Sequence, residues 1–335
     1  MSAHPDFIAG NTRLRARLPA LLGRADYDRL AGLSHEAAVA QLAASVYHPN
    51  LGRDRIDDGQ LLDAVGSRLR ALLRGVRGLY GGTAGAVVDV LLARHDLQDT
   101  LALLRGARTG QPPARRLAAT MCVGALDQPA CVDVAAATDG ATAVIRLAAR
   151  HLPDPVTARG LSAAWEQYTL TDDAEELETT IAATAITGWT ARLAQVGKVA
   201  APALELVHAE CDRANLLAAL RDPTDDMPRL LPQGLVGGPA LSAVRRGSPA
   251  LLLGARPGWS QAVSAHARDG DLPALEWALS MADWVRALRE LRRGDPLGAA
   301  VPVGYVLAAE CEARAVRLLL ADRGSGPNVR ELLVA

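Results

Sequence analysis

A stretch of about twenty residues returns three times in this chain, and this repeat most constrains the fold. The copies span 86–105 (AVVDVLLARHDLQDTLALLR), 202–221 (PALELVHAECDRANLLAALR) and 302–321 (PVGYVLAAECEARAVRLLLA). They align on an acidic residue, which is Asp96, Asp212 or Glu312. The acids lie 212 − 96 = 116 and 312 − 212 = 100 residues apart. Because solenoid units span only about 20–50 residues, the repeat predicts three copies of a small domain.

Each copy has the pattern of an amphipathic helix. At about 100° per residue, the positions six and three before the acid, and four and eight after it, share one face. This face holds Val90, Ala93, Thr100, Leu104; Leu206, Ala209, Leu216, Leu220; and Val306, Ala309, Val316, Leu320. The acid lies about 60° from the centre of this stripe. The pattern therefore predicts a half-buried carboxylate at the edge of each buried face.

A half-buried carboxylate requires an arginine or backbone donors. Arg105 and Arg221 lie nearly opposite their own acids, so we expect the partner to come from another helix. The candidate source is a helix predicted at 11–23, whose arginines are Arg13, Arg15 and Arg17. Two interpretations stay open, a structural ion pair within each copy and a charge offered to a partner protein. The first predicts that Asp212→Ala costs roughly 1–3 kcal/mol, because an arginine is left unpaired.

The composition is that of an all-α protein. Half of the 335 residues are hydrophobic but only 3% are aromatic, and the dominant alanine, leucine and arginine favour helices. The net charge of −1 indicates no basic field for nucleic acid. The four cysteines form no CxxC pair, so we expect reduced thiols, neither disulfides nor metal ligands. Neither a signal peptide nor an apolar run of 18 residues is present, which predicts no membrane span.

Three domains are predicted at 1–113, 114–224 and 225–335, with proline-rich linkers at 109–116 and 222–239. Asn11 is a candidate cap of the first helix, and Ser34 is a candidate cap of the next. A long helix is predicted from about Gln60 to Val76.

The acidic run at 172–176, DDAEE, is the most enzyme-like motif. One hypothesis is a Mg²⁺-dependent all-α enzyme of the isoprenoid-synthase type that uses Asp172 and Asp173. Such a site requires a second acidic motif and an aromatic pocket, yet Phe7 is the single phenylalanine. The alternative is the first turn of a helix after Thr171, where acids favour the macrodipole. We predict no catalytic, cofactor-binding or metal-binding residue.

Several segments together resemble a known family. NTRLRARLPALL (11–22) is similar to that family's Asn–Ala–Arg–Ile–Arg–Ala helix, and VYHPNL (46–51) to its Tyr–Pro element. HDLQDTLALLRG (95–106) and CDRANLLAALR (211–221) resemble its repeated Asp–x–x–Asn–Leu signature, and 309–334 resembles its closing helix and tail. The family is that of the C subunits of bacterial and archaeal V/A-type ATPases, which are related to the d subunits of eukaryotic V-ATPases. Four positions depart from the pattern: Asp99, Thr100, Ala309 and Ala315.

The resemblance implies three similar helical domains in a pseudo-threefold funnel. It implies a non-catalytic rotor adaptor without a cofactor, which links the membrane proteolipid ring to the central stalk. The adaptor transmits torque for ATP-coupled proton or sodium transport, in the cytoplasm, peripheral on the inner face of the membrane. The structural or interface candidates are Arg13, Arg15, Asp96, Arg105, Asp212, Asn215, Arg221, Glu310 and Glu312.

Overall fold

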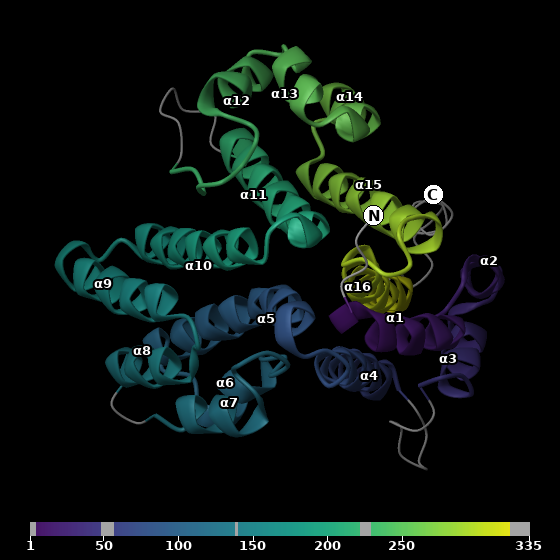
Figure 1. The fold of residues 1–335 in the computed structure, drawn as a ribbon, viewed down its shortest axis with the longest axis horizontal. Coiled ribbons are helices and arrows are strands. Elements are labelled where there is room, and N and C mark those ends of the chain that lie inside the picture. The colour runs from purple at the N-terminus through teal and green to yellow at the C-terminus, as the bar shows by residue number, and fades with distance from the viewer. Residues whose placement is uncertain (1–4, 48–56, 138–139, 222–228, 322–335) are drawn as a thin grey trace. The chain divides into compact units, whose positions relative to one another are not determined.

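The computed structural model describes residues 5–47, 57–137, 140–221 and 229–321. These residues are helical and contain no strand, apart from one isolated bridge between Val123 and Asp127. Figure 1 shows the helices and their connections. The predicted all-α class is therefore confirmed. None of the helices in the described ranges is long and apolar enough to cross a membrane.

The chain divides into two compact units. Unit 1 comprises Met1–Ala84 and Trp284–Ala335, and unit 2 comprises Gly85–Asp283. The helices that lie in unit 1 are α1 (Pro5–Arg17), η1 (Leu18–Ala20), α2 (Arg24–Ala31), α3 (His35–Ala43), α4 (Asp58–Arg77) and α16 (Ala300–Ala321). Within this unit α4 and α16 pack most extensively.

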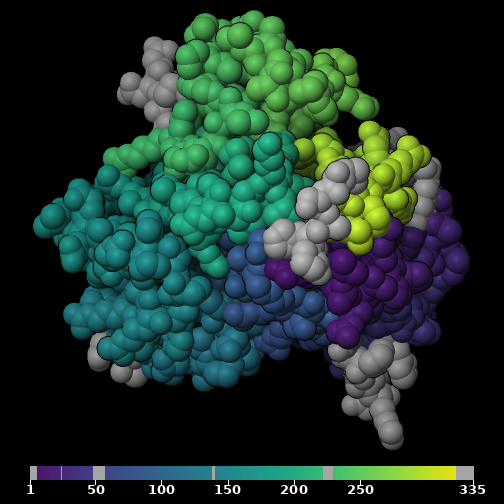
Figure 2. All heavy atoms as spheres, in the orientation of Figure 1, coloured from purple at the N-terminus to yellow at the C-terminus, as the bar shows by residue number. Residues whose placement is uncertain are grey.

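Unit 2 begins within α5 (Gly82–Arg108) and ends within α15 (Leu272–Arg293). Between them lie α6 (Pro113–Ala118), α7 (Gln128–Ala135), α8 (Gly140–His151), α9 (Pro155–Thr171), α10 (Ala174–Val196), η3 (Lys198–Ala200), α11 (Ala201–Arg221), α12 (Gly238–Arg245), α13 (Ala250–Ala255), η4 (Pro257–Trp259) and α14 (Ser260–Asp269). Helices α9 and α10 lie side by side as an antiparallel pair (Figure 1). Figure 2 shows α12, α13 and α14 as one continuous green group of atoms.

The three repeat stretches form the helices α5, α11 and α16, as their periodicity predicts. Ten of the twelve predicted stripe residues are buried; Ala93 and Leu220 are partly exposed. The burial extends well beyond the stripe, because α16 alone buries thirteen residues. A helix with apolar residues on most sides is a central helix of its unit, and this holds for α11 and α16.

Side-chain caps begin many of the remaining helices. The Ser34 hydroxyl accepts a hydrogen bond from the N–H of Ala37 at 3.3 Å, which confirms the predicted cap of α3. Asp57 and Gln60 form a reciprocal capping box at the start of α4. The side chains of Asp127 and Asp154 accept hydrogen bonds from backbone N–H groups in the first turns of α7 and α9. Such caps satisfy N–H groups that have no partner inside the helix.

Asn11 is not the helix cap that the sequence indicated. Helix α1 already begins at Pro5, so Asn11 lies inside it, with 1% of its surface exposed. Its amide nitrogen donates to the carbonyls of Pro296 and Gly298, and its oxygen accepts from the Tyr80 hydroxyl. The misassignment follows from asparagine's ability to bond backbone groups far away in sequence as well as nearby ones.

Some predicted segments lie wholly or partly outside the described residues. These are the loop at 47–60, the linker at 222–239 and the C-terminal tail. The other predicted linker, 109–116, includes the start of α6, where Pro113 occupies the first helical turn.

Candidate functional site

The repeated acids, Asp96, Asp212 and Glu312, are here called the anchor carboxylates. They are 2%, 0% and 3% exposed, so the prediction of half-buried carboxylates was wrong. The reason is the central position of the repeat helices, which covers the edges of the apolar stripe as well as its middle. A fully buried carboxylate must be hydrogen-bonded or paired, and each of the three contacts a different segment.

The first anchor binds a loop that follows its own helix. The carboxylate oxygens of Asp96 accept hydrogen bonds from the N–H groups of Ala125 and Leu126, both at 2.9 Å. The segment 121–126 is here called anchor loop 1. The contact joins the middle of α5 to residues 29 and 30 positions later in the chain.

The second anchor binds both a loop and an arginine. Asp212 accepts from the N–H of Val236 at 2.8 Å, and the segment 231–236 is here called anchor loop 2. The Nε atom of Arg256 donates to the other carboxylate oxygen at 2.7 Å. Arg256 is itself 6% exposed, also pairs with Glu205, and lies over the Trp259 ring. The negative charge of Asp212 is therefore compensated by a buried cation.

The third anchor closes α16 onto the N-terminal helices of unit 1. Glu312 accepts from the Leu22 N–H at 2.7 Å, from the Tyr47 hydroxyl at 2.9 Å and from Nε of Arg68 at 2.9 Å. Arg68 also donates to the carbonyl of Ala20. Burial and the neighbouring Glu312 charge raise the pKa of Tyr47, so its hydroxyl stays a hydrogen-bond donor.

The residue three positions after the acid forms a second contact with the same loop in two copies. Asp99 accepts from the N–H groups of Met121 and Cys122 at 2.6 and 2.7 Å. Asn215 accepts from the Leu231 N–H at 2.7 Å and donates to the Leu231 carbonyl at 3.0 Å. The third copy has Ala315 at this position. The predicted site residue Asn215 is thus placed in a specific contact, and Asp99 is a site residue that sequence reasoning missed.

A glycine marks the point where each loop meets its carboxylate. A Cβ on Gly124 would overlap the Asp96 carboxyl group, and one on Gly234 would lie 2.5 Å from Oδ1 of Asp212. Contacts below 3.0 Å are essentially never made by real Cβ atoms. The loops read GAL at 124–126 and GLV at 234–236. This glycine, followed by two apolar residues, is the signal by which the sequence marks both anchor loops.

The two loops also share an unusual backbone conformation. Cys122 has φ of 52° and Gln233 has φ of 70°, in the left-handed region that non-glycine residues seldom adopt. Such conformations persist only where surrounding contacts determine them. The hydrogen bonds that the loop N–H groups of Cys122 and Leu231 donate to Asp99 and Asn215 are contacts of that kind.

The predicted partners of the acids are corrected by the structure. Arg13 is exposed, and Arg15 donates to the Leu291 carbonyl at 3.0 Å, so neither supplies the anchor contacts shown above. Arg68 and Arg256 supply the guanidinium groups instead. Sequence could not select them, because they lie 244 and 44 residues from their acids.

The other predicted site residues take separate places. Arg105 pairs with Glu178, and Arg221 lies 4.0 Å from Glu276. Glu310 is partly exposed on α16. At the matching position of the first two copies, Arg94 and Glu210 form an ion pair that joins α5 to α11 within unit 2. These predicted residues do not gather into one site.

Asp172 and Asp173 serve as helix ends. Asp172 ends α9 in a left-handed conformation, and the Asp173 carboxylate accepts from the Glu176 N–H at 2.9 Å at the start of α10. Among the described residues neither joins a group of acids, cysteines or histidines close enough to hold a metal ion. The interpretation as a helix start is confirmed, and the isoprenoid-synthase hypothesis gains no support.

Asp99, Cys122 and Cys131 lie close together and are buried. Both oxygens of Asp99 already accept backbone N–H groups, and the Cys131 thiol is 3.4 Å from the Leu126 carbonyl oxygen. Two thiolates and a carboxylate around a divalent ion would leave a buried net negative charge, which is costly without a cationic partner. The group is better explained as the packed inner side of anchor loop 1.

Replacement of the Asn215 amide by a carboxylate is expected to destabilise the protein. In Asn215→Asp, an oxygen would face the Leu231 carbonyl where the amide now donates. We expect a loss of about 1–3 kcal/mol in the free energy of unfolding, measured by urea denaturation at neutral pH. The reverse change in the first copy, Asp99→Asn, should also destabilise, because an NH₂ group would face an N–H. Full stability of Asn215→Asp would show that the Leu231 contact is not made.

Three buried carboxylates tie the repeat helices to other segments of the chain. The protein is therefore an all-helical repeat protein in which the repeated acids have a structural role. The sequence model of one family, described as ATP synthase (C/AC39) subunit, matches residues 10–328. The chain therefore belongs to this family of ATPase subunits, as the resemblance indicated. No curated protein matches the chain.

Proposed function

We propose that this protein is the central-rotor adaptor of a V/A-type ATPase. In this role it links the membrane proteolipid ring to the central stalk and transmits torque for ATP-coupled proton or sodium transport. The observation that carries the proposal is the family match along nearly the whole chain, 10–328. The protein itself performs no catalysis and needs no cofactor in this proposal, and it binds its complex from the cytoplasmic side.

The anchor contacts suit a part that must carry load. Each repeat helix is fixed to another segment by hydrogen bonds to an ionised group, and these are stronger and shorter than bonds between neutral groups. Because the bonds are buried, salt screens them less than surface pairs. A body built on such contacts resists bending of one element against the next.

The three-domain arrangement in a funnel belongs to the same proposal. The anchor contacts favour a division in which each repeat helix opens a lobe. Asp96 binds residues after α5, Asp212 binds residues after α11, and Glu312 binds the N-terminal segment. In that division the third lobe combines α16 with α1–α4. The domains predicted from the sequence, 1–113, 114–224 and 225–335, are instead divided at the proline-rich linkers.

Reconstitution of the ATPase complex tests the adaptor role. A complex assembled without this chain is expected to hydrolyse ATP in its soluble part but to transport no ions. Addition of the purified chain should restore binding of the soluble part to proteolipid-containing vesicles and restore ATP-driven ion uptake. Both are measured on the same preparation, by cosedimentation and by an ion-sensitive dye.

The matched control is Asp172→Asn, since asparagine tolerates the left-handed helix end. This variant should restore coupling as well as the wild type does, because the adaptor needs no chemistry at Asp172. Unchanged ion uptake in the complex that lacks the chain would contradict the proposal. Failure of the chain to bind either the stalk subunits or the proteolipid ring would contradict it as well.

A further inference from the structure

Asp96 differs from the other two anchor carboxylates in its surroundings. Asp212 and Glu312 each receive a guanidinium group, from Arg256 and Arg68. Asp96 receives two backbone N–H groups, which carry only partial positive charge. An ionised carboxylate that is 2% exposed and is held by backbone N–H groups instead of an arginine is costly in the folded state.

A second buried acid adds to this cost. Asp99 lies three residues further along α5, is 1% exposed and holds the same anchor loop 1. Two like charges that share one site disfavour each other's ionisation, so one of them tends to keep a proton. Burial is the larger cause, and the nearby Asp99 adds to it; together they raise the pKa of Asp96 to about 6, although the two backbone N–H groups oppose the rise.

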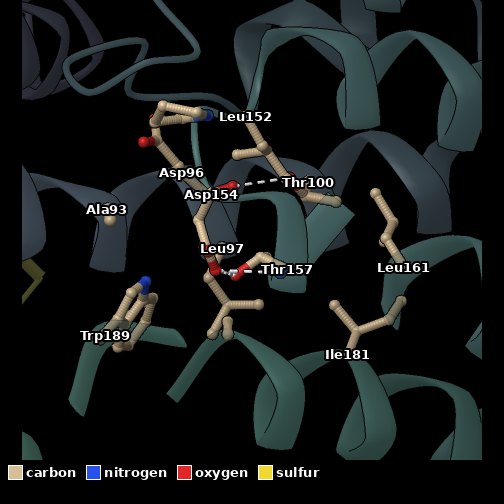
Figure 3. Close-up of a pocket in the computed structure, with 12 residues that line it drawn as sticks. Ala93, Asp96, Leu97, Thr100, Leu152, Asp154, Thr157, Leu161, Ile181 and Trp189 are labelled. Atoms are coloured by element: carbon tan, nitrogen blue, oxygen red, sulfur yellow. Dashed lines mark hydrogen bonds between the residues drawn. The ribbon is translucent and has the colours of Figure 1, made fainter. Parts of the chain in front are cut away.

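Asp96 also lines a partly open pocket of unit 2, shown in Figure 3. The other lining residues are mostly apolar, among them Leu161, Ile181 and Trp189. Asp154 is also in the lining, but its carboxylate is bonded to the hydroxyl and N–H of Thr157. Asp96 therefore borders this mostly apolar pocket, while its carboxylate oxygens are bonded to the Ala125 and Leu126 N–H groups of anchor loop 1.

The titratable groups around Asp96 come from several elements. His95 and Asp99 are neighbours on α5, Cys122 lies in anchor loop 1, Cys131 lies on α7, and Asp154 faces the pocket at the start of α9. Arg192 on α10 acts on Asp154 and pairs with Asp89. Of these groups His95 favours the ionised form of Asp96, whereas Asp99 opposes it.

We propose that Asp96 is a proton-binding site that links mild acidification to the stability of the lobe held by anchor loop 1. Protonation of Asp96 removes a buried charge that has no arginine partner, while the other two anchors keep their arginines. The direction in which stability changes with pH follows from the linkage between proton binding and folding. A carboxyl group whose pKa is higher in the folded state binds its proton before the unfolded chain does, so stability rises as the pH falls from above 6 toward 4. This inference is independent of the adaptor role.

Equilibrium urea denaturation of the full chain at pH 7, 6 and 5 tests the proposal. The Asp96 contribution should raise the folding equilibrium constant about tenfold between pH 7 and pH 5. Asp96→Asn should lose this part of the pH dependence. The matched control is Asp127→Asn in the same region, because Asp127 is exposed and asparagine also caps helices. The control should keep the wild-type pH dependence.

A direct titration covers the case in which Asp96→Asn does not fold. Carboxyl-carbon NMR of aspartate-labelled wild-type protein should show one aspartate that titrates near pH 6, well above the ordinary range. Where Asp96→Asn folds, that signal should be missing. A spectrum in which every aspartate titrates below about pH 4.5 would overturn the proposal. A pH dependence equal in Asp96→Asn and the wild type would also overturn it.

Discussion

Gly124→Ala is expected to destabilise unit 2 by about 2–4 kcal/mol. The new Cβ would overlap the carboxyl group of Asp96 and lie 2.5 Å from its Cγ. Neither side can retreat cheaply, because Asp96 is 2% exposed and Gly124 is buried in a loop fixed by four hydrogen bonds. The change should therefore release Ala125 and Leu126 from the carboxylate. Thermal and urea denaturation measure the loss, and hydrogen exchange at these two amides locates it.

Two further variants identify the cause. Gly254→Ala adds a methyl group where nothing lies within 4 Å, in an exposed part of α13, so it should be neutral or slightly stabilising. In the double variant Asp96→Ala, Gly124→Ala, the loss should be smaller than the sum of the single losses, because the clash is removed. Strict additivity of the two single variants would show that Gly124 is needed for some reason other than the approach of Asp96.

Arg256→Ala should lower the free energy of unfolding by about 3–5 kcal/mol. It leaves the fully buried Asp212 with the Val236 N–H and removes the ion pair between Arg256 and Glu205. Removal of one member of a buried ion pair is more harmful than removal of both, because a buried charge stays behind. For a half-buried carboxylate we would expect Asp212→Ala to lower the free energy of unfolding by roughly 1–3 kcal/mol. Because Asp212 is fully buried, the expected loss is larger. Urea denaturation at neutral pH measures both losses.

A double-mutant cycle separates the ion pair from lost packing. Asp212→Asn in the Arg256→Ala background should recover part of the stability, because it removes the orphaned charge while keeping a hydrogen-bonding side chain. The control is Arg246→Ala at an exposed position after α12, which should change stability by less than about 0.5 kcal/mol. If Asp212→Asn is equally harmful with and without Arg256, the two side chains are not coupled and the ion pair does not hold the loop.

The local features of the chain were accessible from the sequence. The 3.6-residue periodicity of 86–105, 202–221 and 302–321 predicts α5, α11 and α16 within a few residues, since each is a long helix with its own apolar stripe. Ser34 and the acidic run 172–176 mark helix starts correctly, since Ser34 caps α3 and Asp173 caps α10. These signals depend on neighbours within about four residues, so no knowledge of the fold is required to interpret them.

Part of the anchor site was also accessible, namely the acids and Asn215. The depth of burial was misjudged because periodicity describes one face of an isolated helix, and the repeat helices are covered on several sides. Asn11 was misplaced because its partners, Pro296 and Gly298, lie more than 280 residues away. In both cases the missing information was what packs against the helix.

The sequence alone determines that this is an all-helical protein with three related helices, each with an acid at the same position, and that it resembles subunits of V/A-type ATPases. Only the tertiary structure decides which groups bind the acids: Arg256 for Asp212, Arg68 and Tyr47 for Glu312, and backbone N–H groups for Asp96. It also explains why Gly124 and Gly234 are glycines. The reason is physical. Helix formation is local, whereas a buried charge takes whichever donors the packed fold brings to it.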